Sequence, residues 1–521
     1  MRRPVRAHEW ALLALITAGA AALRLIYIGK VAPDPFYDAA VRSMGLSWHN
    51  FFFGAFEPGA SVSIDKPPVD LWLQVASVKL LGFSSTTLKL PEAFAGIATV
   101  PLLFYAVNRM WSATAGLAAA TALAVLPVEV ITSRSDTMDA VMMVLIVLAL
   151  VLIVRACETG RARWLLAGGA AMGLAFDVKL LESVVAVPGL AVFAYLGFPA
   201  SRRRRVGQLA AAGAVFVLVA LSWLGATLLA PAHDRPWAIG STNGSAWNAA
   251  FVFNGTDRLG GKSPEPGNTV YESGHKYPVA TQSQRDHIPI VPPSPTRLLA
   301  RIGPLSGQRL GMELLVALLL GIPALLWGLR RRRSEQGDAL VAGDANPDAD
   351  ANPDNEARLM RAVAGGLGLW LLTGIVLFSH MVRLHPRYVE GMVPPVAAML
   401  GIGAAWAASA RGRLRPAVLA VTLVVVVVYT ERLLYRTPLV WWIALAGAVA
   451  ALAFASLART RALSERVRRL MAPAGVLVAT LCSVLAISAS SDIRAIRDHV
   501  TDAGEVGLLP GDVEQKLSNY L

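Results

Sequence analysis

The chain has 521 residues, of which 55% are hydrophobic and only 16% are charged, against about 25% charged in an ordinary soluble domain. This composition excludes a soluble globular protein and is typical of a polytopic membrane protein. The net charge of +13 comes from short arginine clusters between apolar runs, so it does not indicate nucleic-acid binding.

Apolar windows of about 17–25 residues, long enough to cross a bilayer, recur about thirteen times along the chain. The first follows "MRRPVRAHEW" and shows no clear small-residue cleavage site, which favours a retained signal anchor over a signal peptide. The sequence therefore predicts an all-α polytopic membrane protein. The predicted spans are 9–28, 88–107, 113–132, 138–155, 163–178, 180–198, 207–229, 311–329, 361–379, 391–410, 416–431, 437–457 and 471–489.

Arginine clusters fall on the same side of these predicted spans. They lie at 2–6, 155–163, 202–205, 330–333, 411–415 and 459–469. Because basic residues are retained in the cytoplasm, this side and the N-terminus are predicted to be cytoplasmic. We expect a transmembrane domain over 1–489, a disordered cytoplasmic loop at 333–358, and outer segments at 29–87, 133–139, 230–310 and 379–391, with a short outer tail at 490–521.

The first outer loop contains two predicted surface helices. The stretch "FYDAAVRSMGLSWHNFFFG" has helical spacing, with one apolar stripe formed by Tyr37, Val41, Met44 and Trp48. The stretch "VDLWLQVASVKLLG" indicates a second helix, whose first turn would hold Pro67 and Pro68. Asp65 and Lys66 would then lie just before a helix start at the outer membrane boundary.

Ionisable and aromatic side chains gather in these outer segments, where such groups are candidates for function. Each has a structural alternative: a solvated loop acid, a helix cap, a local ion pair or an interface anchor. Together they favour a substrate that carries both a phosphate and a lipid, because cations bind phosphate and apolar walls accept the lipid. The candidates are Asp34, Asp38, Asp65, Lys66, Asp136, Asp139, Lys179, Glu182, His385, Arg387 and Tyr388.

Several stretches together resemble the GT-C membrane glycosyltransferases, in particular the protein O-mannosyltransferase and aminoarabinose lipid A transferase group and its bacterial mannosyltransferase branch. The resemblance covers most of residues 8–410. It is carried by "FYDAAVRSMGLSWHNFFFGAFEPG", "SIDKPPVDLWLQ", "RSDTMDAVMM", "FDVKLLES", "STNGS" and "HPRYVEGMVPP". It implies a GT-C fold and transfer of a sugar, mannose or another hexose, from a polyprenyl phosphate to an acceptor protein, glycan or lipid on the outer face of the bacterial cytoplasmic membrane.

The resemblance also implies roles for individual residues. The Glu-Lys-Pro motif of the aminoarabinose transferases matches Asp65-Lys66-Pro67, which associates Asp65 with a divalent metal ion and Lys66 with the lipid phosphate. The acidic first-loop motif is broken here, so Asp34 and Asp38 both remain candidates for the base. Asp139 matches the acid at the start of the fourth span. The implied phosphate ligands are Lys66, Arg387 and Arg42, and the implied substrate contacts are Tyr37, Asp136, Lys179, His385 and Tyr388.

Two other functions remain open at this point. A pentosyl transferase of the arabinose type would share the architecture and differ in the sugar. A lipid-linked sugar transporter or flippase would need charges along a path through the bilayer, and it often shows internal repeats. Here the charges gather at one face and no repeat is evident, which favours the enzyme.

Overall fold

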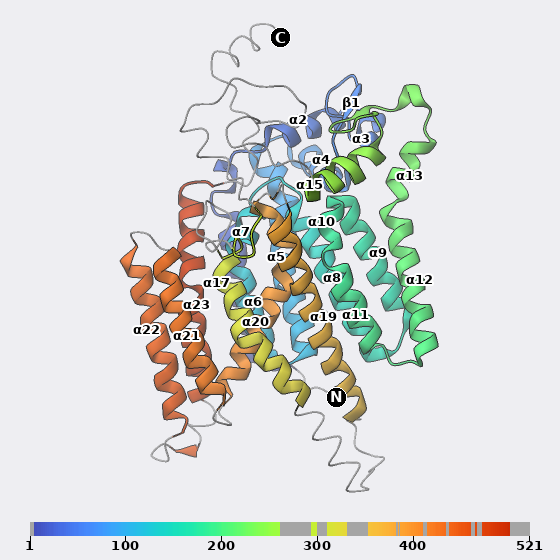
Figure 1. Ribbon diagram of the computed structural model, residues 1–521. Coiled ribbons are helices and arrows are strands. Elements are labelled where there is room, and N and C mark those ends of the chain that lie inside the picture. Colours follow the sequence, from blue (N-terminus) through green and yellow to red (C-terminus); the bar gives the residue numbers. More distant parts are fainter. Residues whose placement is uncertain are drawn as a thin grey trace.

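The computed structural model describes residues 5–260, 293–299, 310–330, 353–381, 384, 386–409, 414–433, 437–459, 464–465 and 471–500. Over these residues the protein is helical apart from one two-stranded sheet (Figure 1). Of the loop predicted to be disordered at 333–358, residues 333–352 lie outside the described residues, whereas 353–358 form the first turns of helix α19, so the prediction of disorder is wrong there. Residues 261–292 and 300–309 of the predicted outer loop and 501–521 of the predicted tail also lie outside the description.

The first half of the chain supplies a bundle of roughly parallel and antiparallel helices. They are α1 (Ala7–Leu25), α5 (Ser85–Met110), α6 (Ala113–Ala124), α7 (Pro127–Thr132), α8 (Asp139–Thr159), α9 (Ala162–Lys179), α10 (Leu181–Val184), α11 (Val187–Gly197), α12 (Arg202–Ala220) and α13 (Ser222–Leu229). The second half supplies α17 (Met312–Val316), η6 (Ala317–Gly321), α19 (Pro353–His380), η7 (Pro386–Met392), α20 (Val393–Ala408), α21 (Leu414–Leu433), α22 (Pro438–Leu457) and α23 (Ala472–Arg497).

Every predicted span falls on a helix or on two consecutive helices, which confirms the all-α membrane architecture. Nine helices among the described residues are long and apolar enough to cross a membrane, or ten if the pair α12 and α13, bent by 46°, counts as one. The count of about thirteen is therefore not confirmed. The window 113–132 breaks before Pro127, because a residue that precedes proline avoids the helical conformation. The window 180–198 breaks into α10 and α11.

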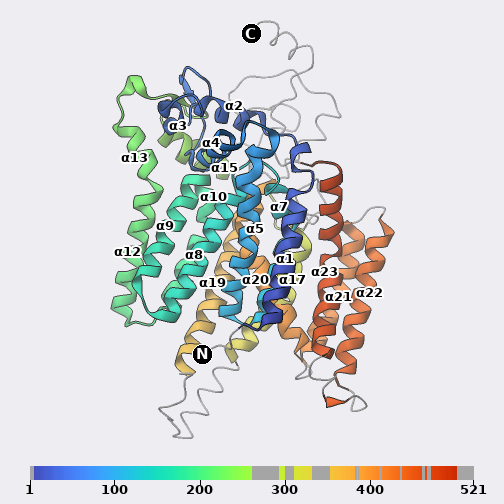
Figure 2. The same cartoon turned by 180° about the vertical axis from the view of Figure 1, so that it is seen from behind.

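The connecting segments form a layer over one end of the bundle (Figures 1 and 2). It consists of η1 (Ile28–Lys30), α2 (Pro35–Met44), α3 (Trp48–Phe53), β1 (Val62–Ser63), α4 (Val69–Leu81), η2 (Ala232–Asp234), β2 (Trp237–Ala238), α14 (Ala246–Asn248), η3 (Ala249–Thr256) and α15 (Asp257–Gly260). The strands pair in parallel, with Val62 opposite Trp237 and Ser63 opposite Ala238. This pairing joins the first loop to the segment after α13.

Two expectations about the first loop need correction. The single apolar stripe ends at Met44, because α2 is capped by Gly45 and Ser47 caps a new helix by accepting the N–H of Asn50; Trp48 is 84% exposed. The prolines precede the second helix and do not occupy its first turn, since α4 begins at Val69 with Pro68 as its N-cap. Tyr37, Val41 and Met44 are buried as expected.

Small residues let the central helices approach closely. In α20 the residues from Val393 to Ala404 are all buried. A Cβ on Gly401 would lie 2.5 Å from the backbone oxygen of Ala115 in α6, so only glycine fits at this crossing. This close packing at the centre of the bundle fixes the ends of the helices, and these ends carry the charged groups of the candidate site.

Candidate active site

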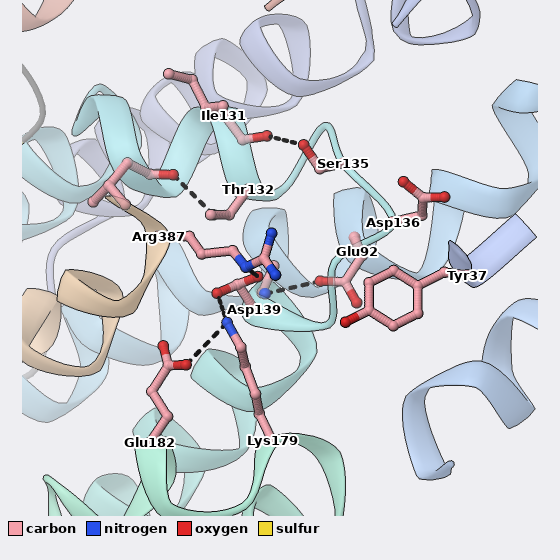
Figure 3. Close-up of polar contacts among 12 residues, drawn as sticks. Tyr37, Glu92, Ile131, Thr132, Ser135, Asp136, Asp139, Lys179, Glu182 and Arg387 are labelled. Atoms are coloured by element: carbon pink, nitrogen blue, oxygen red, sulfur yellow. Dashed lines mark hydrogen bonds and ion pairs between the residues drawn. The ribbon is translucent and has the colours of Figure 1, made fainter. Parts of the chain in front are cut away.

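Asp139 is the centre of a buried cluster of charges at the covered end of the bundle. It is the first residue of α8, and its carboxylate forms an ion pair with Lys179, the last residue of α9. Its second oxygen lies 3.9 Å from Nε of Arg387 in η7, and Lys179 also pairs with Glu182 at 3.0 Å. Figure 3 shows these four side chains pointing toward one another. Two acids and two bases from four elements thus compensate one another, as buried charges must.

Backbone strain marks both sides of this cluster. Met138, directly before Asp139, has φ of 69°, and Leu180, directly after Lys179, has φ of 47°. Large side chains rarely adopt this left-handed region, which costs of order 1–3 kcal/mol and is found most often at functional sites. Both residues are buried. Two strained backbone positions therefore flank the ion pair between Asp139 and Lys179.

Two further buried acids, Glu92 and Asp70, lie near the start of α8, where Asp139 is located. Oε2 of Glu92 in α5 accepts the backbone N–H groups of Ala140 (2.8 Å) and Val141 (3.1 Å), so it caps the start of α8. Asp70 of α4 lies beside Glu92 and accepts a 2.7 Å bond from Gln74. Burial raises the pKa of Asp70. Glu92 and Asp70 were not among the predicted site residues, although an acid inside the apolar window 88–107 was a usable signal for Glu92.

Asp34 and Asp136, predicted separately, are joined in the structure. The backbone N–H of Asp34 donates to both carboxylate oxygens of Asp136 at 3.0 Å, and the Asp34 carboxylate caps α2 by accepting the N–H of Phe36 at 3.0 Å. Both acids are buried. Burial raises the pKa of Asp136 to about 7.

Lys66 and Tyr37 form the next part of the site. The Lys66 ammonium donates to the Tyr37 hydroxyl at 3.0 Å and pairs with Asp65 at 3.4 Å. Burial by itself would lower the pKa of Lys66, but the Asp65 carboxylate and Tyr37 outweigh it, so the pKa is raised and the amine stays charged. Asn254 of η3 donates to the Asp65 carboxylate at 3.2 Å and to its backbone oxygen at 2.8 Å.

A cavity of about 280 Å³ opens onto these residues. Four cations line its polar part, Lys66, Lys179, Arg258 and Arg387, together with one carboxylate, Glu182, which pairs with Lys179. Its remaining wall is mostly apolar and is formed by Leu180, Leu181, Val184, Val185, Pro188, Leu259, Leu377, Phe378 and Met381. Arg258 was not predicted; its guanidinium lies 5.8 Å from the ring centre of Tyr388, which also lies 5.2 Å from the Lys179 ammonium.

Of the predicted residues, those that line this cavity are Lys66, Lys179, Glu182, Arg387 and Tyr388. Asp38 and Arg42 are outside its lining and contact each other. Asp38 pairs with Arg42 one helical turn along α2, at 3.1 Å, and the Arg42 side chain is mostly exposed. Arg42 also stacks over the Phe83 ring, with 3.6 Å between its guanidinium carbon and the ring centre. His385 lies outside the described residues. The structure therefore brings Asp34 to the cluster and leaves Asp38 on the surface.

The surroundings of Asp65 do not fit a divalent cation. Its carboxylate already contacts the Lys66 ammonium and the side-chain nitrogen of Asn254, and these two groups are hydrogen-bond donors, not metal ligands. Within the part of the chain that the structure describes, no three His, Cys, Asp or Glu side chains form a metal-binding group. No step is therefore assigned to a metal at this position.

Comparison with known proteins matches residues 65–224 to a family described as dolichyl-phosphate-mannose-protein mannosyltransferase. Two Bacillus subtilis proteins are similar: "Putative mannosyltransferase YycA", 33% identical over 254 residues, and "Putative mannosyltransferase YkcB", 32% identical over 252. The alignments cover 49% and 48% of this chain and only 37% and 35% of those longer relatives.

The fold is also similar to that of ArnT from Cupriavidus metallidurans, solved bound to undecaprenyl phosphate. The TM-score is 0.52 at 16% identity, over 94% of this chain and 76% of ArnT. The matched family segment contains Asp65 and Lys66 and also three of the four charges of the cluster, namely Asp139, Lys179 and Glu182. The chain is thus similar in sequence to a mannosyltransferase family over residues 65–224 and to two mannosyltransferase-like relatives over about half of its length, and its fold is similar to that of ArnT.

Proposed function

We propose that the protein is a membrane glycosyltransferase that moves a sugar, mannose or another hexose, from a polyprenyl-phosphate donor to an acceptor hydroxyl on the outer face of the cytoplasmic membrane. The description of the matched family and the ligand solved in ArnT support a lipid-phosphate donor. The names of the two Bacillus subtilis relatives favour mannose over a pentose.

One observation carries the proposal: the shape and charge of the 280 Å³ cavity. Lys66, Lys179 and Arg387 surround its polar end, where a phosphate would form charge-assisted hydrogen bonds. The apolar walls from α10, α11 and α19 are suited to the first isoprene units of the lipid. A soluble nucleotide sugar has no lipid chain that would bury apolar surface against these walls.

The chemistry would be a single displacement that inverts the sugar carbon. The acceptor oxygen attacks that carbon while its bond to the phosphate oxygen breaks, and polyprenyl phosphate leaves. Lys66 and Arg387, with Lys179 and Arg258 nearby, would stabilise the negative charge that develops on the leaving phosphate. Asp34 would take the proton of the acceptor hydroxyl. Asp139 would hold Lys179 and Arg387 in position. The Asp136 carboxylate would fix Asp34 by accepting the backbone N–H of Asp34.

The proposed orientation in the membrane follows from the different charges at the two ends of the bundle. The turns from α8 to α9 and from α11 to α12 carry the arginine-rich stretches, and they lie at the same end as the N-terminus (Figure 2). The layer of α2, α3 and α4 lies at the opposite end, over the charged cluster. By the positive-inside rule the arginine-rich end would be cytoplasmic and the cavity would face outward.

The test is a transfer assay with protein reconstituted in vesicles, labelled polyprenyl-phosphate mannose as donor and cell-envelope extract as acceptor. We expect a labelled product that Lys66→Ala abolishes at unchanged protein level. The control is Lys79→Ala, which removes an exposed lysine from the same loop. Full activity of Lys66→Ala would overturn the assigned role of Lys66. Product formed only from a polyprenyl-phosphate pentose would replace hexose by pentose, and lipid translocation without product would reject the enzyme.

A further inference from the structure

A second cavity, of about 390 Å³, lies between the first loop and the segment after α13. Its polar and aromatic lining includes Ser61, Ser63, Trp223, Arg235, Trp237 and Asn243. None of the charged side chains around Asp139 lines it, so the chemistry proposed above leaves it unused. Its lining also includes the last three residues, Asn243, Gly244 and Ser245, of the stretch "STNGS" at 241–245, to which no role has yet been assigned.

The "STNGS" turn is built to hold one aromatic ring. Gly244 has φ of 78°, and a Cβ at this position would lie 2.7 Å from a ring carbon of Trp237. Only glycine therefore permits both the turn and its packing against the indole. The side-chain oxygen of Asn243 accepts the backbone N–H of Ser245 at 3.0 Å, which closes the turn. Trp237 is nevertheless 50% exposed, so part of its ring remains available to a ligand.

The free polar groups of the cavity are mostly donors. Neither the Asn243 side-chain nitrogen nor the Arg235 guanidinium forms a hydrogen bond with another described residue. The described lining contains no carboxylate. An open indole face with donors and serine hydroxyls around it is suited to a ring that is apolar on its face and carries hydroxyls at its edge. A sugar ring has this chemistry.

The backbone argues against an extended peptide as the ligand. The three consecutive N–H groups of Trp237, Ala238 and Ile239 donate to the carbonyl oxygens of Ser61, Gly244 and Ser63, respectively. A peptide that adds to a strand needs unpaired backbone groups at the edge. The two amides of β2 and the amide of Ile239 directly after it are already used, which leaves side-chain recognition as the means of binding.

The two cavities are close neighbours. Ser63 lines this one and Lys66 lines the donor cavity, and three residues of extended chain span about 10 Å at most. Asn254, which lines the donor cavity, holds the intervening Asp65. We infer that the cavity around Trp237 binds a saccharide and presents it as the acceptor to the donor sugar. The acceptor role rests on the proposed glycosyl transfer; the saccharide binding does not.

The test uses the full-length protein in detergent micelles and mannotriose as probe, followed by saturation-transfer difference NMR. We expect saturable binding that Trp237→Ala weakens about tenfold, with part of the affinity kept by Trp237→Phe, because the indole supplies the stacking face. Trp48→Ala is the matched control: it removes a more exposed tryptophan of the same layer and should bind as the wild type. If Trp237→Ala does not fold, Arg235→Ala, which alters an exposed side chain, tests the same site.

The outcomes separate this inference from the proposed function. Absent mannotriose binding, or wild-type affinity in Trp237→Ala and Arg235→Ala, would overturn the saccharide site. Binding of a serine- and threonine-rich hexapeptide in place of mannotriose would overturn it as well. Trp237-dependent binding of mannotriose by a protein that transfers no sugar would reject the transferase and keep the site. Lys66→Ala should lose transfer and still bind mannotriose.

Discussion

At the scale of single residues, the site depends on which acids are buried and which are not. Asp34 and Asp38 are four positions apart and were equal candidates for the base on sequence alone. Asp34 is buried against Asp136, whereas Asp38 pairs with a largely exposed arginine. A surface ion pair of this kind contributes little to stability. The structure therefore distinguishes two aspartates that their spacing could not.

The first prediction concerns this pair. Asp34→Asn should lower the rate of sugar transfer by about 100-fold to 10,000-fold, because an amide cannot accept the acceptor proton. Folding should be retained, since asparagine caps a helix as well as aspartate does. Asp38→Asn is the control and should stay within a few-fold of the wild type. Equal loss in both variants, measured at matched protein level, would contradict the assignment of the base.

A second prediction follows from the pKa of Asp136, which burial raises to about 7. The unfolded value is about 3.9, so between about pH 4 and pH 7 the native state holds a proton that the unfolded state releases. Stability should fall as the pH rises through this range, by up to about 4 kcal/mol from this group. Asp136→Asn mimics the neutral acid and should lose this component of the dependence.

The measurement is the apparent melting temperature in detergent at several pH values between 4.5 and 8. Wild type and Asp136→Asn should melt alike at the acidic end, and the wild type should melt lower at pH 8. Parallel curves over the whole range would show that Asp136 does not titrate there. Other buried acids contribute to both proteins, and the comparison removes their effect.

At the scale of elements, helix ends position the chemistry. Asp139 begins α8, Lys179 ends α9 and Asp34 caps α2, so each side chain is fixed by the point where its helix starts or stops. The apolar windows predicted these helices well because twenty apolar residues in lipid have few alternatives to a helix. The breaks before Pro127 and between α10 and α11 were not predicted, since a hydropathy window averages over them.

The third prediction concerns the start of α8. Glu92→Ala should lower stability by about 1–2 kcal/mol, because two N–H groups of the first turn lose their acceptor. It should also slow transfer, because Asp139 adjoins that turn. Glu92→Gln is the matched control: its amide oxygen still accepts, so stability and transfer should largely return. Thermal unfolding and the transfer assay together check this, and an inactive but fully stable Glu92→Gln would contradict a purely positioning role.

At the scale of the whole molecule, the two ends of the bundle carry different polar groups. The arginine-rich turns lie at one end, and the layer that contains α2, α3 and α4 lies at the other (Figure 1). The proposed donor lipid would approach from the membrane, because the apolar wall of the 280 Å³ cavity is made by the helices α10, α11 and α19. This division makes the orientation testable without any knowledge of the substrate.

The fourth prediction is a labelling experiment on a variant without Cys157 and Cys482. A cysteine at the exposed position Thr242, beside β2, should react with a membrane-impermeant maleimide in intact cells. A cysteine at the exposed position Ser201, before α12, should react only after permeabilisation. The reverse pattern would show that the active site faces the cytoplasm.

The sequence by itself determined the class of the protein, because apolar length and arginine clusters report directly on insertion into a bilayer. Its motifs also identified Lys66, Asp139, Lys179 and Arg387 as charges that share one face. Only the tertiary structure decided how these charges pair, since Asp139 meets partners that lie 40 and 248 positions away in the chain. The choice of Asp34, the supporting Glu92, the contribution of Arg258 and the pocket around Trp237 likewise depend on helices and loops that pack across such separations. The local sequence pattern indicates which residues prefer lipid, water or a helix end. It does not indicate which of these residues come within hydrogen-bonding distance of one another.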